Sequence, residues 1–89
     1  MGNAEAYANQ GNARSAFGDK QGANADFNSA LKINPNYAQA YYNRANARAD
    51  LGDKQGAIAD WQKAAEVFRQ QVNTQLYQRI LELIRKYQQ

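Results

Sequence analysis

The stretch Gly18-Asp19-Lys20-Gln21-Gly22-Ala23 occurs twice, because the same six residues return as Gly52-Asp53-Lys54-Gln55-Gly56-Ala57. The copies are 34 residues apart, and that shift lays Ala4–Tyr37 over Ala38–Gln71 with 16 of 34 positions identical. A fixed period of this length is typical of proteins built from one repeated structural unit. We therefore divide the chain into a first repeat, 4–37, a second repeat, 38–71, and a C-terminal segment, 72–89.

Each repeat is predicted to be a pair of antiparallel helices joined by a tight turn. Gly18 and Gly52 stand where a left-handed residue ends a helix, and Asp19 and Asp53 follow as N-cap acceptors for the next helix. With a helix in the C-terminal segment, the fold is predicted to be all-α, with about five helices. The expected repeat helices are Ala4–Phe17, Lys20–Ile33, Ala38–Leu51 and one that starts near Lys54.

The period and its motifs resemble the tetratricopeptide repeat family, whose units place an aromatic residue, small residues and a closing proline at fixed spacing. The first repeat reads Tyr7-x2-Gln10-Gly11-x2-Arg14, Ala23-x3-Phe27, Ala30 and Pro35; the second reads Tyr41-x2-Arg44-Ala45-x2-Arg48, Ala57-x3-Trp61 and Ala64. Gln10 and Arg44 depart from the usual leucine, Arg14 and Arg48 from the usual aromatic residue, and Arg69 from the proline. The resemblance implies a superhelix of antiparallel hairpins that acts as a protein-interaction scaffold.

The spacing of large and small residues predicts how the two helices of a unit pack. Tyr7, Phe17 and Phe27 are expected to wedge between helices, while small residues such as Gly11 let the backbones approach. Asp26 and its second-repeat equivalent Asp60 are expected to face water.

The C-terminal segment is amphipathic from Gln75 to Tyr87 and is predicted to cap the core of the second repeat. Asn73 or Thr74 would then cap this helix. In the alternative, the apolar spacing runs unbroken from Trp61 to Tyr87 and predicts one helix from about Lys54 to Gln88. Such a helix would need a partner's repeats and would form a domain-swapped homodimer.

The resemblance also implies a binding site, because the first helix of each family unit lines a concave groove that takes a peptide. Asparagines three residues apart share a helix face and offer both a donor and an acceptor to a peptide backbone. A clamp for a terminal carboxylate is not expected, because Ala8 and Tyr42 provide no cation. The peptide-binding residues implied by alignment are Glu5, Asn9, Asn12, Gln39, Tyr42, Asn43, Asn46 and Asp50.

The composition argues against other classes of function. The 89 residues contain no cysteine and no histidine, which leaves the serines without an activating base and a metal without its commonest ligands. The charge of +3 comes from 11 basic and 8 acidic residues that are mixed along the chain, unlike a dense nucleic-acid-binding stripe. We expect no enzyme activity, no cofactor, no metal, and neither nucleic acid nor membrane as a partner.

The expected partner is a protein or peptide, and the default location is the cytoplasm. The alternative function is self-association of the repeat module without a separate ligand. The chain begins almost at a repeat boundary, which is typical of a piece of a longer protein or of an engineered repeat.

Overall fold

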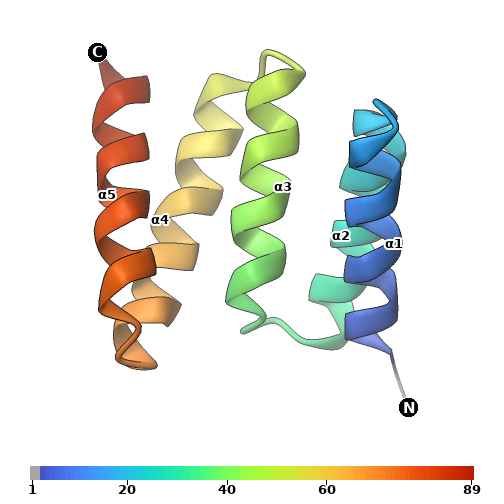
Figure 1. Ribbon diagram of the computed structural model, residues 1–89, viewed down its shortest axis with the longest axis horizontal. Helices are drawn as coiled ribbons and strands as arrows, with labels where there is room; N and C mark the ends of the chain where they lie inside the picture. Colours follow the sequence, from blue (N-terminus) through green and yellow to red (C-terminus); the bar gives the residue numbers. More distant parts are fainter. Residues whose placement is uncertain (1–2) are drawn as a thin grey trace.

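The computed structural model describes residues 3–89, and these form five α-helices that run up and down in chain order (Figure 1). The predicted all-α hairpin fold is therefore confirmed, with helix bounds within one residue of the expected ones in the first three helices. The helices are α1 (Ala4–Ala16), α2 (Lys20–Ile33), α3 (Ala38–Asp50), α4 (Lys54–Gln70) and α5 (Thr74–Gln88).

The two repeats use the same turn between their helices. Gly18 and Gly52 adopt φ angles of 90° and 88°, a left-handed conformation that glycine reaches without a Cβ clash. The carboxylates of Asp19 and Asp53 then accept a hydrogen bond from the backbone N–H three residues later, at 2.9 Å in each case. These two residues fix the reversal that makes each pair of helices antiparallel.

The junction between α4 and α5 is a third turn, in which Val72 takes the left-handed place with a φ of 60°. The Asn73 side chain caps α5 by accepting from the N–H of Leu76 at 3.4 Å. The single helix from about Lys54 to Gln88 is therefore wrong, because α4 ends at Gln70. Since α5 folds back onto α4 of its own chain, the structure does not require the swapped dimer to bury its apolar face.

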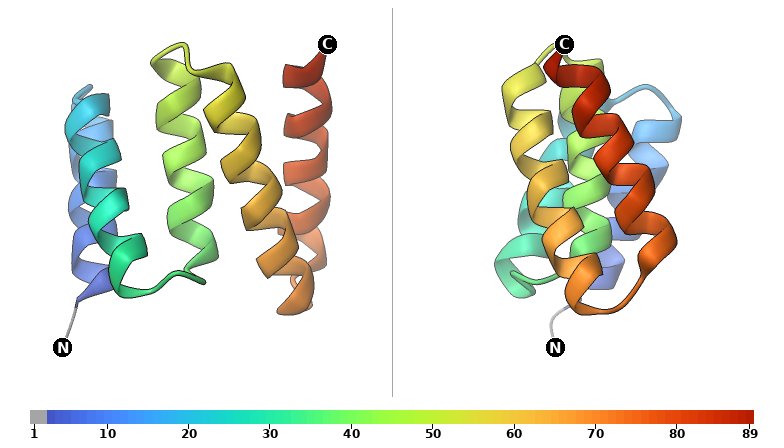
Figure 2. Two further views of the ribbon diagram at one scale, coloured as in Figure 1. Left: turned by 180° about the vertical axis from the view of Figure 1, so that it is seen from behind. Right: turned by 90° about the vertical axis from the view of Figure 1, so that its left-hand side faces the viewer.

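The helices lie in two layers. Figures 1 and 2 show α1, α3 and α5 on one side of the molecule and α2 and α4 on the other. Each helix packs on its neighbour in the chain, and α1 also touches α3. The backbones of α3 and α5 are not in direct contact, because α4 lies against both. The first helix of each repeat and the terminal helix therefore present one common face.

The larger part of the core lies in the second half of the chain. Trp61 is 1 % exposed and its ring meets Tyr87 of α5 edge-on, with the centroids 4.9 Å apart. Phe68, Ile80 and several alanines complete this cluster. The apolar face of α5 thus covers the second repeat, as a capping helix should.

The core of the first repeat is smaller, and the expected wedge is only partly formed. Phe27 is buried and packs on Gly11, where an added Cβ would stand 2.8 Å from the ring. Tyr7 and Phe17 are 40 % and 90 % exposed, so the prediction that they wedge between helices is wrong. Phe17 follows the last residue of α1, at the turn between the two helices of the first repeat.

No helix within residues 3–89 combines the length and the apolar character needed to cross a membrane.

Candidate protein-binding face

The predicted site residues lie on α1 and α3, in the layer that α5 extends. We call the surface formed by these eight residues the amide face, because five of them are asparagine or glutamine. Five of them are exposed, namely Glu5, Asn9, Asn12, Gln39 and Asp50. Tyr42, Asn43 and Asn46 are partly buried.

A hydrogen bond between two asparagines joins the repeats across this face. Asn43 of α3 donates its side-chain N–H to the amide oxygen of Asn12 of α1 at 3.0 Å. Each amide has two N–H groups and an oxygen with two lone pairs, so the pair keeps further capacity after this bond. The pair therefore holds polar groups in a defined orientation at the seam between the two repeats.

Other members of the predicted set are engaged within the fold. Asn46 accepts a hydrogen bond from the indole N–H of Trp61 at 3.2 Å, which satisfies a buried donor. Asp50 pairs with Lys20 of the first repeat at 3.2 Å. The ring of Tyr42 packs against the second core cluster. These three residues support the face and have less freedom to contact a ligand than the exposed amides.

Beneath the face lies an ion-pair network in the second repeat. Asp60 receives two hydrogen bonds from the guanidinium of Arg44, at 2.7 and 2.8 Å, and one from Arg48 at 3.0 Å. Its side chain is only 5 % exposed, so the expectation that Asp60 faces water is wrong. Arg44 also donates to Asn28 of α2 at 2.6 Å, which ties the two repeats together. Hydrogen bonding to Asp60 raises the pKa of Arg44 above its ordinary value, although burial of the guanidinium opposes the shift.

The first repeat carries a weaker version of the same network. Asp26 is likewise buried rather than solvent-facing, and its carboxylate lies 3.0 Å from Nε of Arg14. Gln10 stands where the second repeat has Arg44 and approaches Asp26 only to 3.5 Å. One arginine and one amide therefore replace the two arginines of the second repeat.

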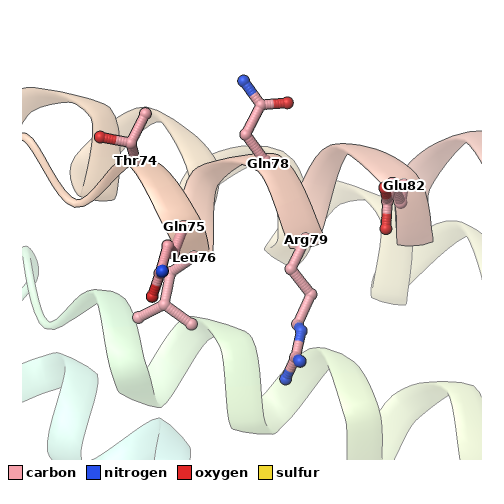
Figure 3. A pocket seen from close by; sticks show the side chains of 6 residues that line it. All are labelled: Thr74, Gln75, Leu76, Gln78, Arg79 and Glu82. Carbon is pink, nitrogen blue, oxygen red and sulfur yellow. The ribbon is translucent and has the colours of Figure 1, made fainter.

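The contribution of α5 to this layer was not predicted from the sequence. Leu76 and Arg79 of α5 point toward the side where α3 lies, while Gln78 points away (Figure 3). A shallow hollow lies along this part of α5, lined by Thr74, Gln75, Leu76, Gln78, Arg79 and Glu82. The signal was available in the repeat itself, because the helix after a complete hairpin occupies the place of a first helix.

The two serines are engaged in hydrogen bonds within the first repeat. Ser15 accepts a hydrogen bond from Lys20 at 2.9 Å, and Ser29 donates to the carbonyl of Ala25. Within residues 3–89, no three acidic side chains converge as a metal site would require. Together with the neighbouring part of α5, the amide face presents amides, two carboxylates, one aromatic ring and the Arg79 cation.

Comparison with known families now identifies the architecture. The sequence pattern of the tetratricopeptide repeat matches residues 4–37, and a second pattern of the same repeat matches residues 27–59. The chain belongs to the tetratricopeptide repeat family. Such repeats mediate protein–protein interactions, and the family is one of non-enzymatic scaffolds.

A solved structure supports the tetratricopeptide repeat fold. The crystal structure of MamA protein matches with a TM-score of 0.68 over 94 % of this chain, at 22 % sequence identity. The match covers 52 % of the MamA chain, so the present chain spans about half the length of that structure. At this identity the likeness concerns the fold alone. A comparison with curated proteins found no matching sequence.

Proposed function

We propose that this tetratricopeptide repeat chain binds a peptide segment of a partner protein on the amide face. The observation that carries the proposal is the Asn12–Asn43 pair, which fixes two amides at 3.0 Å across the junction of the repeats. Amides of this kind can donate to a carbonyl and accept from an N–H of the same peptide backbone. Backbone recognition of this kind suits a scaffold that accepts a segment rather than a small molecule.

The surroundings of the pair also favour a peptide. Asn9, one turn before Asn12, and Gln39, one turn before Asn43, add exposed amides, and α5 offers Leu76 as an apolar residue and Arg79 as a cation. Arg79 has no carboxylate of the described residues within ion-pair distance, in contrast to Arg14, Arg44 and Arg48. A peptide with an acidic side chain near Arg79 would therefore gain an ion pair that a neutral peptide lacks.

The proposal predicts that binding depends on Asn43. Two repeats present a small interface, so we expect weak binding, with a dissociation constant in the micromolar range or higher. Replacement by alanine removes one amide of the pair and should weaken binding about fivefold to tenfold, the effect of losing a hydrogen bond worth about 1 kcal/mol. Isothermal titration with a panel of peptides would measure the change.

Asn36→Ala provides the matched control, because Asn36 is an exposed asparagine in the turn between α2 and α3. It should bind like the parent chain. Equal binding by the Asn43→Ala and Asn36→Ala variants would remove the pair from the site. A complete lack of binding across acidic, basic and neutral peptides would count against peptide recognition itself.

Self-association is the second candidate, because the first hairpin exposes the large apolar side chains of Tyr7 and Phe17. It need not compete with peptide binding, since those two residues lie outside the amide face. For either function we propose the cytoplasm as the location, which localisation of the tagged chain in cells would test.

A further inference from the structure

Asn46 is the member of the amide face that bonds directly to the core of the second repeat. Its amide oxygen accepts a hydrogen bond from the indole N–H of Trp61 at 3.2 Å. Trp61 is buried, and the ring of Tyr87 packs edge-on against it from α5. Because the indole N–H is shielded from water, it depends on Asn46 for its hydrogen bond.

This hydrogen bond fixes which end of the Asn46 amide points inward. The indole nitrogen and the amide nitrogen both carry donors only, so only the amide oxygen can face Trp61. Turning the amide over would place donor against donor and leave a buried N–H unpaired, which is costly. The N–H2 group of Asn46 is therefore held on the side away from Trp61.

The N–H2 group of Asn46 is open to a ligand. Within residues 3–89 it has no hydrogen-bond partner, and it is not among the buried side-chain atoms that lack one, so it reaches solvent. The residue as a whole is only partly exposed. A donor that is already held in one orientation loses little conformational entropy when it bonds to a ligand.

The first repeat reaches the same arrangement by another route. Asn12 is the equivalent of Asn46, but Phe27 stands where the second repeat has Trp61 and has no N–H to offer. The oxygen of Asn12 accepts instead from the side chain of Asn43 at 3.0 Å. In both repeats the oxygen at this position is engaged within the protein. The amide face therefore offers a ligand N–H groups at two equivalent positions.

We infer that Asn46 is a specificity-determining residue that donates a hydrogen bond to an acceptor of the bound segment, and that Trp61 is the positioning residue that enforces this direction. The inference rests on the proposed function, because it assigns roles within the same site. The matching group on a peptide is a backbone carbonyl oxygen. Carbonyls of an extended segment are free to accept, whereas those within a helix are already bonded. An extended segment is therefore the expected occupant.

Asn46→Asp separates this role from a purely structural one. Aspartate has nearly the same shape and keeps an oxygen for the indole N–H, but it replaces the outward N–H2 group with a second acceptor. Isothermal titration with a terminally blocked, uncharged peptide should show binding about tenfold weaker than that of the parent chain. Asn36→Asp makes the same change in the exposed turn between α2 and α3 and should bind like the parent. Circular dichroism would verify that both variants keep the parent helix content.

The single tryptophan gives a second readout in the unmodified chain. A proton–nitrogen correlation spectrum contains one indole N–H signal, which should shift when a peptide carbonyl bonds to the other end of the Asn46 amide. The probe is the strongest-binding peptide of the panel. An unshifted indole signal at saturating peptide, or binding by Asn46→Asp as tight as by the parent, would overturn the inference and leave the proposed function standing. If no peptide of the panel binds the parent chain, the proposed function and the inference fail together.

Discussion

Asn24 is the residue at which the first repeat departs most clearly from the second. Its side-chain oxygen is buried and has no hydrogen-bond partner within residues 3–89, whereas Ile58 at the equivalent position packs against the core. A buried polar atom that loses its hydrogen bond to water costs about 1–3 kcal/mol. The second repeat thus indicates which side chain the first would need.

We expect Asn24→Ile to raise the free energy of unfolding by about 1–2 kcal/mol, because it removes an unsatisfied oxygen and buries an apolar side chain. Urea unfolding followed by circular dichroism would measure the change. The reverse exchange, Ile58→Asn, should lower stability by a similar or larger amount. A loss of stability in Asn24→Ile would show that the amide has a partner such as ordered water.

Residue-scale chemistry also explains what sequence reasoning could not predict. Asp60 looked like a solvent-facing carboxylate, because the arginines that pair with it lie 12 and 16 residues away on another helix. Helical periodicity within one segment carries no information about such pairs. Once Arg44 and Arg48 are seen on the facing helix, their departure from the family's apolar residues is explained by the buried carboxylate between them.

At the scale of single elements, the turn before α5 stores an avoidable strain. Val72 adopts the left-handed conformation at φ 60°, a place that Gly18 and Gly52 take in the turns within the two repeats. A β-branched side chain in this region costs roughly 1–2 kcal/mol relative to glycine, which is partly offset by the greater freedom of glycine in the unfolded chain. The helix end is therefore set by its surroundings rather than by its own residue.

We expect Val72→Gly to stabilise the chain by about 1 kcal/mol, since Val72 is 83 % exposed and loses little packing. Thermal unfolding would show a higher midpoint. The complementary change, Gly52→Val, should lower it, because Gly52 has a φ of 88° and open space around it, so only the backbone resists. A lower midpoint for Val72→Gly would mean that α4 and α5 tend to form one helix in solution.

The helices of the two repeats were the part of the structure that the sequence predicted best. The repeat fixed four helices because the same glycine and aspartate punctuation occurs twice. The start of the fifth helix was undecided, since the apolar spacing runs through Val72 without a break and fits both a turn and a continuous helix. The choice depends on whether the free energy that α5 gains by packing on Trp61 exceeds the strain energy of the left-handed Val72. That balance involves tertiary contacts, which helical periodicity does not report.

At the scale of the whole molecule, α5 is the element on which the second repeat depends. It contributes Ile80 and Ile84 to the main cluster, and Tyr87 covers the edge of Trp61. Each large apolar side chain buried is worth about 1.5–3 kcal/mol, while a domain of this size has a total stability of about 5–10 kcal/mol. Burial of Ile80 and Ile84 alone therefore corresponds to about 3–6 kcal/mol, a large part of that total.

We expect a chain truncated after Gln71 to lose cooperative unfolding, because Trp61 and the alanines around it would face water. The single tryptophan reports this loss, since exposure shifts its emission to longer wavelength, and far-UV circular dichroism would show reduced helix content. Arg85→Ala controls for sequence changes in α5, because Arg85 is exposed and should leave both signals unchanged. A truncated chain that still unfolds cooperatively near the parent midpoint would show that two repeats stand without their cap, and that the apolar face of α5 serves another purpose.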